Sequence, residues 1–155
     1  MPQLCIIKFD AMLQLKNSKN KISNVHKVFI TDEDCIFDAL KQIVDELVLN
    51  PNPCLSLVYA NSNKYPQHIF DQGVSFLEKR FPEKLLIYKA PICKGTVCIG
   101  VEFLKPLIKS NSSEEMKFFL YGKSQFVYSL SNTLIFLGIK SVIITKPSNT
   151  NCDEN

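Results

Sequence analysis

The triplet Gly122-Lys123-Ser124 has the residue types that close a phosphate-binding P-loop. A P-loop also needs an earlier glycine, at position 117 here, because successive backbone N–H groups must wrap around the phosphates before the lysine and the hydroxyl reach them. Residue 117 is a lysine, and residues 118–121 read Phe-Phe-Leu-Tyr. Such an apolar run is typical of a buried strand. The triplet is therefore predicted to be a turn after a strand, with Lys123 either solvated or directed at a phosphate.

Carboxylates gather at Asp32, Glu33, Asp34 and Asp38. Carboxylate oxygens are ligands that Mg²⁺ and Ca²⁺ accept, but the glycine and the ligand spacing of an EF-hand loop are absent. Acidic residues in the first turn of a helix are common because they complement the helix dipole. The cluster therefore favours helix capping over a metal site.

Cys35 lies at the predicted start of the same helix, a position that often activates a thiol. Here the neighbouring carboxylates disfavour the thiolate, and no histidine close in the sequence supplies a base. The six cysteines and two histidines of the chain also lack the spacing of a zinc site. The sequence thus predicts neither a catalytic residue nor a metal ion, and most of the cysteines are expected to pack as small core residues.

Apolar strands alternate with amphipathic helices along the chain. Strands are predicted at 4–9, 27–30, 55–60, 84–88, 117–121 and 141–145, and helices at 35–49, 68–80, 101–108 and 125–137, the last closed by Gly138. This alternation predicts an α/β fold with a five-stranded parallel, doubly wound sheet and helices on both faces, plus a short N-terminal strand. Ligands of such sheets bind outside the carboxyl ends of the strands. The segments that matter are therefore TDEDC after the first core strand and YGKS after the fourth.

The chain is expected to comprise an N-terminal strand and loop over 1–24, one domain over 25–146 and a loose tail over 147–155. Its 155 residues are 46% hydrophobic with a net charge of +3, and Arg80 is the only arginine. A nucleic-acid partner is not expected, because such proteins usually carry an arginine-rich basic face. No run of residues has the length and apolarity of a membrane span or a signal peptide, so a cytoplasmic protein is expected.

Four stretches resemble the pyridine-nucleotide half of the ferredoxin reductase superfamily, nearest to cytochrome b5 reductases. They are KVFITDEDCIFDALKQIVDELV, LSLVYAN, EKLLIYKAP and FFLYGKSQFVYSLSNTLIFLGI, and the resemblance covers about residues 22–145. In that family the first stretch carries a G-G-x-G-x-[TS]-P turn at the nucleotide pyrophosphate, and the last carries C-G-P-P near the nicotinamide. The resemblance implies an NAD(P)H-type site, in which Thr31, Cys35, Asn61, Tyr121, Gly122, Lys123 and Ser124 are the candidate cofactor-binding residues.

The chain departs from both family motifs. Asp32, Glu33 and Cys35 stand at the three glycines of the first turn, where side chains obstruct the backbone approach to the phosphates and the carboxylates repel an anion. In the second motif Gly122 is retained, whereas Tyr121 replaces the cysteine and Lys123-Ser124 replace the prolines. The pattern implies no resident cofactor, with NAD(P)H as the candidate should one bind.

Two functions stay open. The stretch before the first core strand is too short for the flavin-binding barrel of the family. The aromatic residue that ends the chain in the family is also missing, so FAD is not expected on this chain alone. Hydride transfer from a nicotinamide would then lack an acceptor. The favoured hypothesis is a degenerate, non-catalytic relative, a pseudoenzyme that serves as an interaction scaffold for another protein or a larger assembly. The alternative is an NAD(P)H-binding oxidoreductase module that works with a flavin domain on another chain.

Overall fold

The computed structural model describes residues 25–59, 67–93, 96–97, 99–110 and 115–145. Their elements, in chain order, are β1 (Val25–Thr31), α2 (Ile36–Leu49), β2 (Cys54–Tyr59), α3 (Gln67–Arg80), β3 (Leu85–Lys89), β4 (Ile92–Cys93), β5 (Thr96–Val97), α4 (Val101–Ser110), β6 (Glu115–Tyr121), α5 (Ser124–Phe136) and β7 (Val142–Ile144). The predicted order of strands and helices is confirmed over these residues. The predicted strand at 4–9 and the tail at 147–155 lie outside them.

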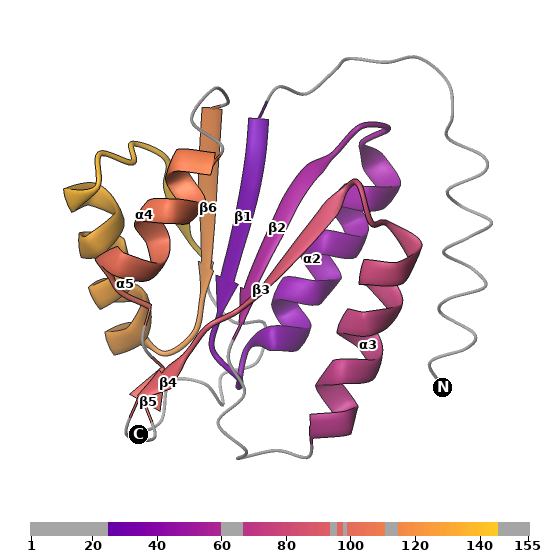
Figure 1. Ribbon diagram of the computed structural model, residues 1–155, viewed down its shortest axis with the longest axis horizontal. Coiled ribbons are helices and arrows are strands. Elements are labelled where there is room, and N and C mark those ends of the chain that lie inside the picture. The colour runs from indigo at the N-terminus through magenta and orange to yellow at the C-terminus, as the bar shows by residue number, and fades with distance from the viewer. Residues whose placement is uncertain (1–24, 60–66, 94–95, 98, 111–114, 146–155) are drawn as a thin grey trace.

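Five strands form one parallel sheet in the order β3-β2-β1-β6-β7. Helices α2 and α3 cover one face of this sheet, and α4 and α5 cover the other (Figure 1). The fold class is therefore confirmed as a parallel, doubly wound α/β sheet. The strand order reverses between β1 and β6, and this reversal is the switch point at which such sheets offer a crevice.

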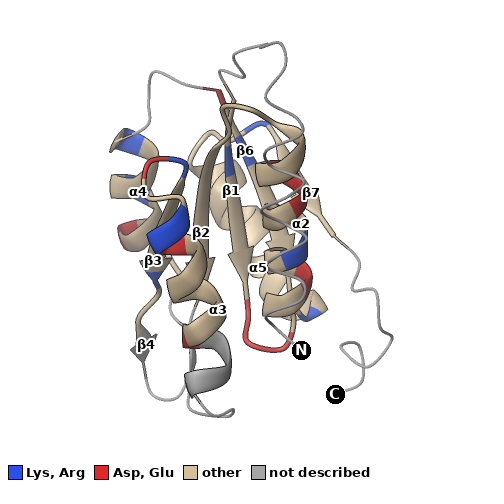
Figure 2. Cartoon of the chain, turned by 90° about the vertical axis from the view of Figure 1, so that its right-hand side faces the viewer, with Lys and Arg blue, Asp and Glu red and all other residues tan. Residues whose placement is uncertain are grey.

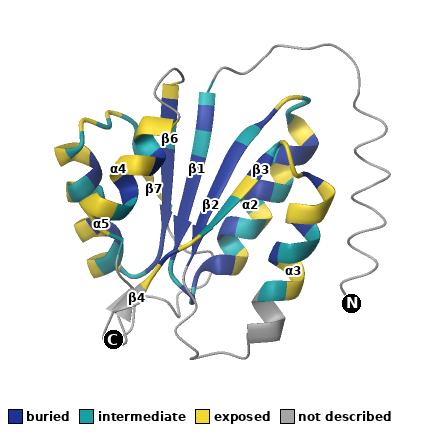
Figure 3. Cartoon of the chain, viewed as in Figure 1, coloured by how far each residue is buried: buried dark blue, intermediate teal, exposed yellow. Residues whose placement is uncertain are grey.

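The central strands are buried on both faces, as their dark colour in Figure 3 shows. Phe29 of β1 faces α2 and stacks on Phe119 of β6, with ring centroids 4.9 Å apart. Val28 and Ile30 face the opposite way, into the apolar cluster beneath α4 and α5. Burial on both faces explains why these strands read as continuous apolar runs in the sequence.

Helix α5 ends in a Schellman motif, as Gly138 led us to expect. The Gly138 N–H donates to Ile135 O and the Ile139 N–H to Leu134 O, both at 3.0 Å. Gly138 has a φ of 86°, a conformation that favours glycine. The cap satisfies carbonyls that the helix end would otherwise leave open.

Several element bounds differ by one or two residues from the sequence-based expectation, and one strand pair was not expected. Helix α4 continues to Ser110 although Pro106 lies inside it, two residues beyond the predicted end at 108. Leu104 and Leu107 are buried on its inner side, so packing against the sheet offsets the lost N–H donor of the proline. The antiparallel pair β4–β5 was not predicted, since each strand is only two residues long.

A matched pair of glycines tests the helix cap. Gly138→Ala is expected to lower the free energy of unfolding by about 1 kcal/mol, because alanine disfavours a positive φ. Gly73→Ala within α3 is expected to raise it by about 0.5–1 kcal/mol, because alanine is the better helix former. Neither added Cβ meets an atom within 4 Å, so sterics do not separate the two variants. Urea denaturation followed by circular dichroism measures both, and equal changes would contradict the cap assignment.

Candidate functional site

The switch point brings the two predicted loops together. Thr31 and Tyr121 pair across β1 and β6, so TDEDC and YGKS leave the sheet side by side. Gly122 follows Tyr121 with a φ of 153°. A Cβ at Gly122 would lie 2.6 Å from Asp32 Oδ2 and 2.7 Å from the Phe126 ring, so no side chain fits there. The retained glycine of the resemblance thus has a physical reason that needs no ligand.

The Asp32 carboxylate joins the two loops. Its Oδ1 accepts the Cys35 N–H at 3.0 Å, and its Oδ2 accepts the Lys123 N–H at 2.9 Å. Cys35 and Lys123 are the N-cap residues of α2 and α5, and neither caps its helix with its own side chain. One carboxylate therefore serves the N-termini of both helices, and the expected capping role of the acidic cluster is confirmed for Asp32.

Burial and hydrogen bonding have opposite effects on the pKa of Asp32. Burial raises the pKa of Asp32 above its ordinary value of 3.8, while the backbone N–H groups of Lys123 and Cys35 act to lower it and the Asp34 charge raises it further. The loop after β1 is the continuous red segment in Figure 2. An anion that approached this loop would meet negative charge before it met a backbone N–H.

The Lys123 side chain contacts a carboxylate rather than an open space. Its Nζ lies 3.7 Å from Asp34 Oδ2, and 42% of the Lys123 side chain is exposed. The Asp34 side chain is 20% exposed, and a partly exposed pair at this distance contributes little to stability. It nevertheless ties the same two loops that Asp32 joins.

Of the other predicted site residues, some are buried, one is exposed and one lies outside the described ranges. Thr31 is buried, and its hydroxyl donates to the backbone oxygen of Asp32 at 2.9 Å. Cys35 is also buried, which agrees with the core role expected for most cysteines. Ser124 is exposed at the start of α5. Asn61 lies outside the described residues.

Tyr121 points away from the switch point, toward α2. Its hydroxyl donates to Gln42 Oε1, and its ring stacks on Phe29 with centroids 6.4 Å apart. Burial raises the pKa of Tyr121 to about 12; a hydrogen bond with Thr145 acts to lower this pKa, and the charges of Asp38 and Glu46 raise it further. Since the side chain fills the core beneath α2, Tyr121 does not line the crevice beside α5.

A pocket of about 410 Å³ opens beside the Asp32 contacts. Besides Asp32 and Lys123 it is lined by residues that sequence reasoning missed: Ile99, Gln125, Phe126, Ser129 and Leu130. Gln125 and Ser129 are four positions apart, which places them on one side of α5. That spacing was the one sequence clue to this part of the pocket.

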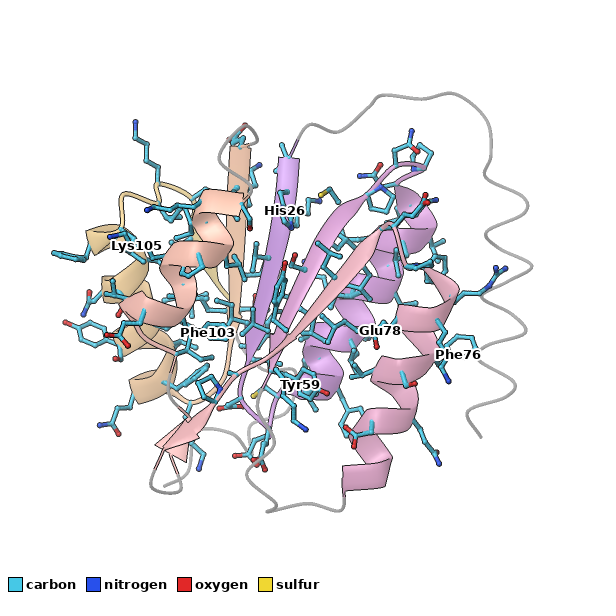
Figure 4. The ribbon with its side chains drawn as sticks, in the orientation of Figure 1. His26, Tyr59, Phe76, Glu78, Phe103 and Lys105 are labelled. Carbon is cyan, nitrogen blue, oxygen red and sulfur yellow. The ribbon has the colours of Figure 1, made fainter. Side chains whose placement is uncertain are left out.

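His26 is buried but belongs to the opposite end of the sheet. Figure 4 shows His26 near the start of β1, whereas Tyr59 ends β2 at the side of the candidate site. His26 Nε2 lies 2.7 Å from Ser56 Oγ within the core. Its position excludes it as a base for any group at the switch point.

Two further properties bear on function. Within the described ranges, no three or more His, Cys, Asp or Glu side chains are grouped so that they would hold a metal ion. None of the described helices has the length and apolarity to cross a membrane.

Comparison with protein-family models, with curated proteins and with solved structures finds no match to this chain. The resemblance to the ferredoxin reductase superfamily therefore rests on the motifs and the spacing within this sequence.

Proposed function

We propose that this chain is a degenerate NAD(P)H-binding-type domain, related in design to the cytochrome b5 reductases, that acts as a cytoplasmic interaction scaffold without catalysis of its own. The observation that carries the proposal is the position of the Asp32 carboxylate. It accepts N–H groups from both loops of the switch point, where a nucleotide domain would bind an anionic pyrophosphate.

A nucleotide would have to compete with this carboxylate. Entry of a phosphate at the same N–H groups requires displacement of Asp32 from Cys35 and Lys123, and the displaced charge would stay close to the phosphate. Asp34 adds a second negative charge beside Lys123. Repulsion and the loss of two hydrogen bonds to a charged acceptor both oppose binding.

The pocket beside α5 favours the alternative, an NAD(P)H-binding module that transfers electrons through a flavin domain on another chain. Its volume of about 410 Å³ falls in the range of small-molecule sites. Gln125 and Ser129 offer polar groups, and Phe126 offers an aromatic edge. For this alternative function, the Lys123 ammonium would leave Asp34 and contact a phosphate of the nucleotide.

Calorimetric titration separates the two functions. We expect no saturable heat from NADH, NADPH or FAD at about 1 mM ligand, from a sample whose circular dichroism shows it folded. Dissociation constants near 1 mM correspond to about 4 kcal/mol of binding free energy, the weak end of specific recognition. Binding of a pyridine nucleotide with a dissociation constant below about 100 μM, weakened by Lys123→Ala, would contradict the scaffold function and support the redox module.

A further inference from the structure

Helix α5 has a second apolar face, directed at solvent. Val127, Leu130 and Leu134 are buried against the sheet, as a surface helix requires. On the outer side Tyr128 is 69% exposed, and Ile135 and Phe136 are 61% and 79% exposed. Phe136 is the most exposed large apolar side chain of the described residues. Exposed apolar side chains gathered on one helix face are typical of an interaction surface.

The outer face has the spacing of a helix-pairing stripe. Residues separated by three, four and seven positions share one side of a helix. The exposed residues Gln125, Tyr128, Ser129, Asn132, Ile135 and Phe136 follow this spacing, and we call them the α5 stripe. Asn132 lies at its centre, with Tyr128 before it and Ile135 and Phe136 after it.

The α5 stripe carries no charge, and neither does any other position of Ser124–Phe136. The other long helices have charged side chains among their exposed residues: Lys41 and Asp45 of α2, Glu78, Lys79 and Arg80 of α3, and Glu102, Lys105 and Lys109 of α4. Figure 3 marks the exposed positions on the outer side of α5 in yellow. A neutral face has no charge with which to select a charged partner and none with which to repel a copy of itself.

We infer that the α5 stripe pairs with the α5 stripe of a second copy of this chain, in an antiparallel arrangement about a two-fold axis at Asn132. A two-fold interface uses the same surface on both copies, so a residue before the axis meets a residue after it. Tyr128 of one copy then lies against Ile135 and Phe136 of the other. The amide of Asn132 both donates and accepts, so it is able to pair with itself at the axis. The inference rests on the proposed scaffold role and names its partner.

The size of the face sets the strength of the pairing. A helix of 13 residues is about 20 Å long, and one such helix covers less than the roughly 800 Å² per partner of a standard stable interface. The dimer is therefore expected to be a weak one. Such an interface forms at high local concentration, as in an assembly.

Sedimentation velocity of the full chain from about 10 μM to 1 mM tests the dimer. The expected result is a concentration-dependent shift from monomer to dimer. Ile135→Lys and Tyr128→Glu are each expected to weaken dimerisation at least tenfold, and both sites are exposed, so folding is expected to persist. Leu49→Lys on α2, where the native leucine is 67% exposed, is the matched control and is expected to leave the dimer intact.

Mixing the two variants tests the antiparallel geometry. Position 135 of one copy lies opposite position 128 of the other, so a mixed pair has two different contacts. At one contact the lysine of the Ile135→Lys chain meets the glutamate of the Tyr128→Glu chain, and at the other the native Tyr128 and Ile135 meet. An equimolar mixture is therefore expected to recover the dimer that each variant alone has lost. Phe136→Lys repeats the test should the Ile135→Lys chain unfold.

Three results would overturn the inference. They are a wild-type chain that stays monomeric at 1 mM, a Leu49→Lys chain that dissociates as the α5 variants do, and a mixture that stays monomeric. The nucleotide titration is a separate measurement, although Gln125 and Ser129 belong both to the α5 stripe and to the pocket. A chain that stays monomeric and binds no nucleotide would contradict the α5 dimer but not the scaffold function. A chain that dimerises and binds NADH would contradict the scaffold function but not the α5 dimer.

Discussion

Gly122→Ala is expected to lower the free energy of unfolding by about 3 kcal/mol, from backbone strain and overpacking together. The φ of 153° at Gly122 is one that residues with a side chain rarely adopt. The new methyl group would also lie 2.6 Å from Asp32 Oδ2 and 2.7 Å from the Phe126 ring. Urea denaturation gives the loss, which should exceed that of Gly138→Ala because Gly138 has no atom in the way.

A double-mutant cycle isolates the steric part of this effect. In an Asp32→Ala background the nearest obstructing atoms are gone, so Gly122→Ala is expected to lose about 1 kcal/mol less than in the wild type. The positive φ and the contact with Phe126 persist in both backgrounds. An equal loss in the two backgrounds would show that Asp32 does not occupy the space above Gly122.

The sequence predicts the fold well because each element carries a strong local pattern. The run Phe118-Phe119-Leu120-Tyr121 is apolar because β6 is buried on both faces, and both apolar clusters draw on it. Gly138 is equally local, since its cap forms within α5 and the residues that follow. Periodicity and capping therefore suffice for strands and helices of ordinary length.

The candidate site is less predictable because its main contacts are distant in sequence. Asp32 and Lys123 are 91 residues apart, and only the register of β1 against β6 brings them together. Nothing in the segment TDEDC distinguishes Asp32, which accepts N–H groups at the N-termini of two helices, from Asp34, which contacts a half-exposed lysine. The direction of Tyr121 follows from strand alternation with Phe119, but its partner Gln42 comes from another helix.

The exposed face of α5 is a second feature that the sequence alone does not predict. Its apolar residues read as part of an ordinary amphipathic helix, because the sequence does not show which face meets the sheet. The structure assigns Val127, Leu130 and Leu134 to the core and leaves Tyr128, Ile135 and Phe136 outside. The absence of charge along α5 then becomes informative, since every other long helix of the described chain has charges among its exposed residues.

Asp32→Ala is expected to lower the free energy of unfolding by about 2 kcal/mol. Two backbone N–H groups, those of Cys35 and Lys123, lose a charged acceptor. Each hydrogen bond to a charged group contributes about 1.5–3 kcal/mol, and the cost of burying the carboxylate offsets part of this gain. Asp34→Ala is the matched control. It removes a carboxylate from the same loop, one that lies 3.7 Å from the Lys123 ammonium, and leaves the acceptor of both backbone N–H groups in place, so it should lower stability by less than Asp32→Ala does.

The pH dependence of the Asp32→Ala effect tests the electrostatic balance at this carboxylate. Burial raises the pKa of Asp32 above 3.8, so the folded chain holds this proton more tightly than the unfolded chain does. A group of this kind contributes most to stability below its unfolded pKa, and the contribution declines as pH rises through the folded pKa. The loss caused by Asp32→Ala should therefore be larger at about pH 4 than at about pH 7. A loss that grows toward pH 7 would mean that the two N–H groups outweigh burial, and the switch point would then be a better anion site than the scaffold proposal allows.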